Sequence, residues 1–228
     1  MPDLSYRDLA KMMDHSLLQQ TLTDAQLDEG CRLARDYDVA SVCIKPYAVT
    51  RAAELLRGSG VAVGTTVGFP HGGHLSALKV AEAVAALDDG AGELDMVVNV
   101  GKVLSHDWAY VAADIAAVVE VAHQGGALVK VIFENCFLGD AEKERLCHIC
   151  GEVGADFVKT STGYGEGGAT DEDLRLMRRF APPHVGVKAA GGVRTYDRLL
   201  AVRQLGVTRV GATATKAILD ECKARRNV

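Results

Sequence analysis

The sequence has no excess of basic residues and no long apolar run. Its 228 residues include 25 Lys and Arg against 30 Asp and Glu, which gives a formal net charge of -5. This balance creates no positive field for a phosphodiester backbone, so no nucleic-acid partner is expected. The most apolar helical stretch, residues 110–122, is interrupted by Asp114 and Glu120, whereas a membrane span needs about 20 apolar residues. No membrane partner is expected either.

The sequence also lacks the features of export and of a metal centre. Residues 1–8 are polar and acidic, whereas a secretory signal is basic and then apolar, so a cytoplasmic location is expected. The six cysteines are then predicted to be reduced thiols rather than a disulfide framework. Cys147 and Cys150 have the spacing of a metal or redox pair, but no second pair completes a zinc site. We therefore assign no cofactor.

Along the chain, two kinds of segment alternate. Short runs of apolar and β-branched residues are each followed by turn residues and then by a segment of helical periodicity. This pattern predicts strands at residues 39–44, 61–67, 94–98, 128–133, 156–160, 185–189 and 208–212. An eighth, very short strand is placed at residues 12–15, after a helix at residues 5–11.

Helices are predicted between these strands, at residues 24–35, 46–56, 75–87, 108–123, 141–153, 171–179, 196–205 and 216–223. Asp171 and Thr195 are predicted to be N-caps, because their side-chain oxygens can accept bonds from free backbone N–H groups. Glycines at helix ends favour a left-handed C-cap conformation; they are Gly58, Gly90, Gly125, Gly154 and Gly206.

The alternation fits either an open doubly wound sheet or a closed barrel. A nucleotide-binding sheet normally has a glycine-rich loop after its first strand, but Lys45-Pro46-Tyr47 follows residues 39–44. The glycine-rich segment 163–168 follows a late strand and is interpreted as a barrel loop. No linker rich in Pro or Ser divides the chain. The count of units therefore favours an α/β fold, an eightfold β/α barrel formed by residues 1–228 as a single domain.

Polar residues that end apolar strands are the candidates for catalysis, since barrel active sites lie at the carboxyl ends of the strands. In this sequence they are Asp14, Cys43, Asp95, Glu134, Lys159 and Lys188.

Two of these candidates, Lys159 and Lys188, occupy an unusual place for lysine. Burying an ammonium is costly unless it is paired or loses its proton, and consecutive strands would bring the two amines together. Each charge is then expected to lower the pKa of the other lysine. A free amine attacks carbonyls, so the pair suits Schiff-base chemistry, with Asp95 moving protons beside the imine. The alternative is that both lysines extend to solvent or bind phosphate as point charges.

Several strand-end segments resemble those of the deoxyribose-phosphate aldolase family. The two lysines lie in FVKTSTG at residues 157–163 and in VKAAGGVR at residues 187–194. Further similar segments lie at residues 13–18, 41–44, 67–70, 93–101 and 130–134, so the resemblance extends along nearly the whole chain. It implies a class I aldolase that reversibly cleaves 2-deoxy-D-ribose 5-phosphate to D-glyceraldehyde 3-phosphate and acetaldehyde, in deoxyribonucleotide catabolism.

The resemblance also implies roles for individual residues. Lys159 would form the Schiff base, Lys188 would perturb it and assist proton transfer, and Asp95 would be the proton shuttle. The pocket would be lined by Asp14, Ser16, Cys43 and Thr162, although for Cys43 alone a packed strand thiol is the preferred interpretation. Barrel phosphate sites use the loops after the last strands, which here contain Gly191, Gly192, Gly211, Ala212 and Thr213.

This sequence departs from the family in the phosphate turn, where paired small hydroxyl residues appear as Thr213-Ala214. One hydroxyl is missing, and Lys216 one turn later either compensates for it or is an exposed helix residue. Some relatives end in a tail with a tyrosine, which is absent from residues 225–228.

Other functions stay open beside this one. A sister aldolase could use a different aldehyde acceptor, and a metal-dependent barrel enzyme could use His15, His71, His74 and Asp95 as ligands. A small phosphorylated sugar is the expected partner, and the sequence is compatible with a homo-oligomer.

Overall fold

The computed structural model describes residues 4–226 and contains a closed barrel of eight parallel strands, in which each strand pairs with the next and β8 pairs with β1. The strands are β1 Met13–Leu17, β2 Ser41–Ile44, β3 Ala62–Val67, β4 Glu93–Val97, β5 Leu128–Ile132, β6 Phe157–Lys159, β7 Gly186–Ala190 and β8 Arg209–Ala212. The predicted eightfold barrel is confirmed, including its short first strand.

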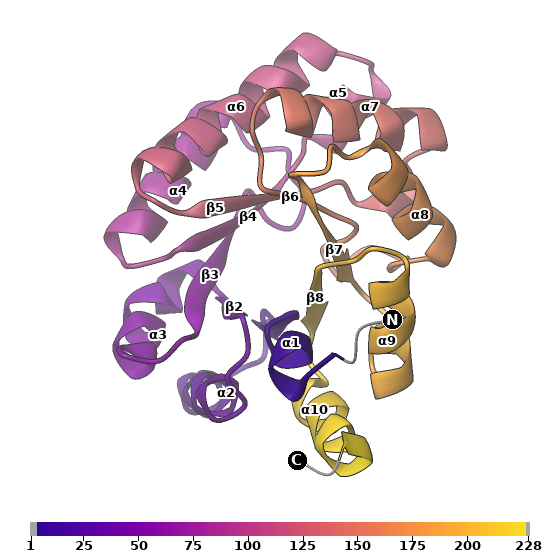
Figure 1. The fold of residues 1–228 in the computed structure, drawn as a ribbon. Helices are drawn as coiled ribbons and strands as arrows, with labels where there is room; N and C mark the ends of the chain where they lie inside the picture. The colour runs from indigo at the N-terminus through magenta and orange to yellow at the C-terminus, as the bar shows by residue number, and fades with distance from the viewer. Residues whose placement is uncertain (1–3, 227–228) are drawn as a thin grey trace.

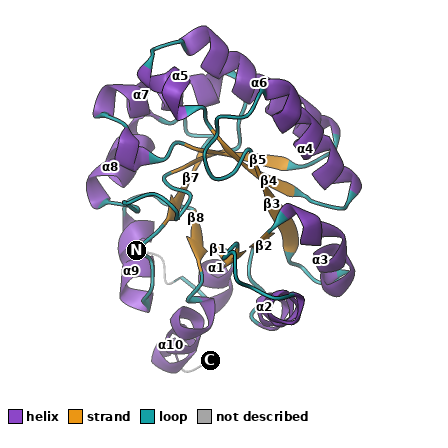
Figure 2. Ribbon diagram, turned by 180° about the vertical axis from the view of Figure 1, so that it is seen from behind, coloured by secondary structure: helices purple, strands orange, loops and turns teal. Residues whose placement is uncertain are grey.

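Helices form an outer ring around the strands (Figure 1), and the same ring is seen from behind in Figure 2. They are α1 Tyr6–Ala10, α2 Asp24–Asp36, α3 Val49–Leu56, α4 Ser76–Asp88, α5 Val100–Leu104, α6 Trp108–Gln124, α7 Asp140–Glu152, α8 Asp171–Phe180, α9 Tyr196–Gln204 and α10 Thr215–Arg226, with 3₁₀ turns η1 Pro46–Ala48 and η2 Asn135–Phe137. Within residues 4–226, no helix has the length and apolar character that a bilayer span requires.

Some local predictions need correction. Thr170, not Asp171, is the N-cap of α8, because its hydroxyl accepts the bond from the third helical N–H and Asp171 is the first helical residue. Thr195 caps α9 as predicted. Gly125 keeps a helical φ of -82°, and the left-handed position is Gly126. The other four predicted C-cap glycines have positive φ. The short helix α5 was not predicted, since five residues are too few to show a helical period.

Apolar and charged residues alternate along β4. In β4, Leu94 and Met96 are buried in the apolar core, whereas Glu93 and Asp95 form ion pairs with groups on other strands inside the barrel. This alternation follows from the two-residue period of a β-strand. Apolar packing between strands and helices therefore holds a barrel whose interior is charged.

A second buried charge pair lies outside the barrel, between α4 and α6. Lys79 Nζ lies 2.6 Å from Asp114 Oδ2 and donates to the carbonyl of Val97 at 2.8 Å. Ser76 donates to the other Asp114 oxygen at 2.6 Å. The side chains of Lys79 and Asp114 are 0% and 1% exposed. The pair thus ties two helices to the end of β4, close to the carboxyl face of the barrel.

We expect Lys79→Met to lower the free energy of unfolding by about 3–5 kcal/mol, because it leaves a buried carboxylate without its cation. Urea unfolding followed by circular dichroism measures this change. Lys216→Met is the matched control, since Lys216 pairs with Asp220 on the surface and is 64% exposed, and exposed pairs contribute about 0.2–1 kcal/mol. Equal effects of the two substitutions would contradict the assigned role of Lys79.

Candidate active site

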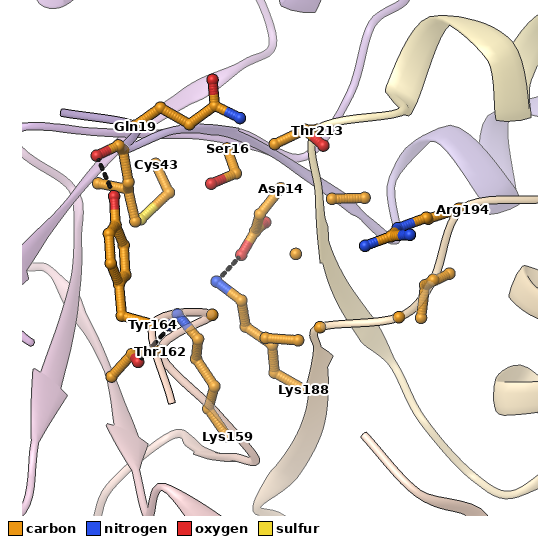
Figure 3. A pocket seen from close by; sticks show the side chains of 18 of the residues that line it. Asp14, Ser16, Gln19, Cys43, Lys159, Thr162, Tyr164, Lys188, Arg194 and Thr213 are labelled. Atoms are coloured by element: carbon orange, nitrogen blue, oxygen red, sulfur yellow. Dashed lines mark hydrogen bonds and ion pairs between the residues drawn. The ribbon is translucent and has the colours of Figure 1, made fainter. Parts of the chain in front are cut away.

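A pocket with a volume of about 460 Å³ opens at the carboxyl ends of the strands (Figure 3). Parallel strands in a barrel all end on this face, so the loops after them form its walls. Its lining consists of Asp14, Ser16, Leu18, Gln19, Gln20, Thr21, Cys43, Lys159, Thr162, Gly163, Tyr164, Lys188, Ala190, Gly191, Gly192, Val193, Arg194, Gly211, Ala212 and Thr213.

All the residues that the sequence predicted to bind substrate line this pocket. Of the three predicted catalytic residues, one does not. Lys159 and Lys188 reach the pocket, but Asp95 is fully buried and lies beneath the pocket lining. Asp95 is nevertheless in direct contact with both lysines. The structure therefore brings the three residues together, with the carboxylate below the amines.

The two lysines share one carboxylate oxygen. β6 and β7 pair with Lys159 opposite Lys188, and both Nζ atoms lie 2.7 Å from Asp95 Oδ2. Their side chains are 4% and 1% exposed. Lys188 also lies 2.5 Å from Asp14 Oδ2, an ion pair visible in Figure 3. Lys188 thus has two carboxylate partners where Lys159 has one.

This difference sets the proton affinities of the two amines. Burial lowers the pKa of Lys159, and the charge of Lys188 lowers it further, so the attraction of Asp95 does not bring that pKa back to its ordinary value. Burial acts against the charge of Lys188 as well, but Asp14 and Asp95 together raise the pKa of Lys188. The expectation that each lysine lowers the pKa of the other is met in Lys159, whereas the net pKa of Lys188 is raised because Asp14 and Asp95 both lie against it.

A third lysine, Lys130 in β5, was missed in the sequence. Its Nζ donates to Asp95 Oδ1 at 2.9 Å and to Glu93 Oε2 at 2.6 Å, and lies 3.2 Å from Asp14 Oδ2. Burial alone would raise the pKa of Asp95, but the ammonium groups of Lys130, Lys159 and Lys188 hold it well below its ordinary value. Lys130 lies in the middle of an apolar strand, and that position was the signal that could have identified it.

The loop after β6 forms a wall of the pocket. Thr162 donates from its backbone N–H at 3.1 Å and from its hydroxyl to the carboxylate of Glu134, which lies between β5 and η2. Tyr164 then extends across to the loop after β1, where its hydroxyl donates to the carbonyl of Leu18 at 2.7 Å. Its ring packs edge-on against Phe69, with the centroids 5.5 Å apart. Glu134 therefore anchors this wall instead of facing the substrate.

Cys43, on β2, lies next to the carboxylate oxygen that the two lysines share. Its Sγ is 3.9 Å from Asp95 Oδ2, and the side chain is buried although it lines the pocket. Burial and the nearby carboxylate raise the pKa of this thiol to about 11. The thiol is thus a neutral, packed group beside the amines.

The other end of the pocket offers backbone N–H groups and one cation. Gly191 and Gly192 have φ of 84° and 91°, a region that favours glycine. Arg194 follows them, lines the pocket and forms no ion pair with any residue in the described range 4–226. Thr213 also lines the pocket, whereas Ala214 packs against the core.

Lys216 is not part of this end. Its Nζ pairs with Asp220 Oδ2 at 2.5 Å on the surface of α10. Of the two interpretations left open by the sequence, the exposed helix residue is the one that the structure favours. Arg194 was missed, although its position two residues after Gly192 was a usable signal.

The histidines proposed as metal ligands lie on two separate segments, β1 and the loop after β3. His71 and His74 are exposed in the loop after β3. His15 is buried against α10, its Nδ1 lies 2.9 Å from Thr215 Oγ1, and burial lowers its pKa to about 4. In the described part of the chain, no group of three or more His, Cys, Asp or Glu residues is arranged to hold a metal ion.

Comparison with known proteins matches residues 9–214 to the model of the DeoC/LacD family aldolases. A deoxyribose-phosphate aldolase of Rhodopirellula baltica is 56% identical over 98% of this chain and 92% of its own length. A deoxyribose-phosphate aldolase of Thermococcus gammatolerans is 47% identical over 93% of this chain and 96% of its own length.

Solved structures agree with these relatives. The tetrameric deoxyribose phosphate aldolase of Aeropyrum pernix superposes with a TM-score of 0.89 and 30% identity, over 97% of this chain and 93% of that chain. The residues matched by the family model, 9–214, include all eight barrel strands and both lysine segments. From the family match, the identities and the shared fold, the chain belongs to the DeoC/LacD aldolase family.

Proposed function

We propose that this chain is a class I aldolase that reversibly cleaves 2-deoxy-D-ribose 5-phosphate to D-glyceraldehyde 3-phosphate and acetaldehyde through a Schiff base on Lys159, as part of deoxyribonucleotide catabolism. The observation that carries the proposal is the amine of Lys159, which reaches the pocket, lies 2.7 Å from Asp95 and has a lowered pKa. A buried lysine that releases its proton readily is the nucleophile that this chemistry needs.

In the proposed reaction, Lys159 Nζ attacks C1 of the open-chain sugar, and loss of water gives a protonated imine. A base then takes the proton of the C3 hydroxyl, the C2–C3 bond breaks, and its electron pair moves into the imine to form an enamine. Glyceraldehyde 3-phosphate leaves with C3 as its aldehyde carbon. Protonation of C2 and hydrolysis of the imine release acetaldehyde and restore the free amine.

The neighbours of Lys159 are arranged for the proton transfers. Asp95 is buried below the pocket, so its protons reach the substrate through the amines that touch it or through water. Asp14 and Lys188 both line the pocket and lie 2.5 Å apart. Their contact keeps Lys188 in its charged form, in which it can donate a proton to the leaving water or to C2.

The far end of the pocket is proposed to bind the phosphate. The Gly191-Gly192 turn, Thr213 and Arg194 all line the pocket, and within residues 4–226 the guanidinium of Arg194 has no carboxylate partner. Backbone N–H groups and arginine are strong donors to phosphate oxygens. The absent hydroxyl at Ala214 is thereby offset by Arg194 rather than by Lys216. This division separates recognition of the phosphate from the chemistry at Lys159.

We also propose that residues 1–228 form one domain and that the protein works in the cytoplasm as a homo-oligomer. A relative of this fold is described as tetrameric. Large apolar side chains on the surface of this chain support a contact between copies, with Leu75 70%, Tyr47 67% and Leu78 56% exposed.

We expect Lys159→Ala to abolish cleavage of deoxyribose 5-phosphate while leaving the barrel folded, because a small side chain is tolerated at a strand end. Borohydride reduction in the presence of acetaldehyde should add one two-carbon adduct to the wild type at Lys159 and none to the variant. Peptide mapping by mass spectrometry locates the adduct. An adduct on Lys188 of the wild type would overturn the assignment.

We expect Asp95→Asn to slow cleavage by about 10²-fold or more, since general acid–base steps contribute on the order of 10²–10⁴. The amide keeps the shape of the carboxylate, so some imine should still be trapped by borohydride. Deuterium incorporation from heavy water into the methyl group of acetaldehyde measures proton transfer directly. Incorporation at the wild-type rate would show that Asp95 takes no part in it.

We expect Arg194→Met to raise the Michaelis constant for deoxyribose 5-phosphate by about tenfold or more, because a hydrogen bond to a charged group is worth roughly 1.5–3 kcal/mol. Unphosphorylated deoxyribose should be cleaved as before. Ala214→Ser should change the constant less than Arg194→Met does, and Lys216→Met is the matched control for loss of a surface cation. An equal loss with both sugars, or a larger loss in Lys216→Met, would place the phosphate elsewhere.

A further inference from the structure

The interior of the barrel contains more positive than negative groups. Seven ionisable side chains from six strands are connected by ion pairs there, and Arg209, the most exposed of them, has a side chain that is 12% exposed. They are the cations Lys130, Lys159, Lys188 and Arg209 and the carboxylates Asp14, Glu93 and Asp95. If all seven were ionised, the interior would carry a net charge of +1. Loss of one proton makes it neutral.

The ion pairs are not shared equally among the four cations. Lys130 lies within 4.0 Å of all three carboxylates, at 2.6 Å from Glu93, 2.9 Å from Asp95 and 3.2 Å from Asp14. Lys188 has two carboxylates, and in the described chain Lys159 has one, Asp95. The proton that neutralises the interior is therefore lost most easily from Lys159.

Arg209 and Glu93 form the part of this network farthest from the substrate. They are the first residues of β8 and β4, and neither lines the pocket, which opens at the other ends of the strands. Arg209 Nη1 lies 2.6 Å from Asp14 Oδ1 and 3.0 Å from Glu93 Oε1. Its guanidinium also packs over the ring of Phe157, 5.3 Å from the centroid. The arginine thus adds a permanent charge, since guanidinium does not release its proton in proteins.

We propose that Glu93 and Arg209 are positioning residues whose charges decide that Lys159, and not Lys188, is the barrel lysine that reacts as a free amine. This inference rests on the proposed function of Lys159. Arg209 pairs with one oxygen of Asp14, and the other oxygen pairs with Lys188 at 2.5 Å and with Lys130 at 3.2 Å. Glu93 and Asp95 Oδ1 also hold Lys130. Asp95 Oδ2 is then the one carboxylate oxygen left beside Lys159 in the described residues, and it is shared with Lys188.

The groups that face Lys159 come from three other strands. They are Asp95 on β4, Lys188 on β7 and the thiol of Cys43 on β2. Burial first, and then the charge of Lys188, lower the pKa of Lys159, whereas Asp95 and Cys43 act to raise it. Removing the charge of Arg209 leaves three cations against three carboxylates, so a protonated Lys159 no longer makes the interior positive. Removing the charge of Glu93 has the opposite effect.

The test is the pH dependence of kcat/KM for cleavage of deoxyribose 5-phosphate and, in parallel, of the rate at which borohydride traps acetaldehyde on Lys159. In Arg209→Met the acid limb of both profiles should move to higher pH by on the order of one unit, the scale on which one charge acts in a shared low-dielectric interior. In Glu93→Gln the acid limb of both profiles should move to lower pH. The double variant removes one charge of each sign and should return the limbs close to the wild type.

Two results separate the possible failures. If the wild type is not trapped at Lys159, the proposed function and this inference both fail. If the wild type is trapped there but the two single variants leave the limbs in place or move them in the same direction, the inference alone fails. Far-UV circular dichroism monitors folding. If Arg209→Met does not fold, Glu93→Gln is compared with Glu93→Asp, which keeps the charge. The acid limb should then move to lower pH in Glu93→Gln but not in Glu93→Asp.

Discussion

The carboxylate of Asp95 is the interaction on which the rest of the site depends. It lies in an interior without solvent exposure and touches the ammonium groups of Lys130, Lys159 and Lys188 through its two oxygens. Charges in such an interior are stable only while they are paired, so this one group is a partner that all three lysines share. A reactive amine follows because one carboxylate oxygen is shared between two amines, and Lys188 has a second carboxylate in Asp14.

The register of the barrel makes this arrangement possible. Closure of eight parallel strands aligns Asp95 with Lys130 and Lys159 with Lys188 between neighbouring strands, while Asp14 on β1 reaches the same centre from the other side. The apolar packing outside the strands supplies the stability of the fold and leaves the interior free for charge. The loops then add what differs among barrels: Tyr164 closes one wall, and the Gly191-Gly192 turn with Arg194 forms the end that suits a phosphate.

The sequence predicted the parts of this structure that depend on local patterns. All eight strands lie within about two residues of their predicted ranges. Seven were visible directly, because alternating apolar runs and helical periods are local signals, whereas the pattern alone would not have identified the short first strand. Lys159 and Lys188 were identified because a lysine that ends an apolar strand is rare. Lys130, Glu93 and Arg209 were missed because their importance lies in contacts across the barrel, between strands that are far apart in the chain. The raised pKa of Lys188 was missed for the same reason, since it depends on Asp14.

The order of proton affinities is the most direct test of the central claim that the network makes Lys159 the free amine. NMR titration of the lysine side chains in the unliganded protein, assigned with Lys159→Arg and Lys188→Arg, measures both values. We predict a pKa for Lys159 below the ordinary value of 10.5 and below that of Lys188, whose pKa should lie above 10.5. A pKa of Lys159 equal to or above that of Lys188 would contradict the claim.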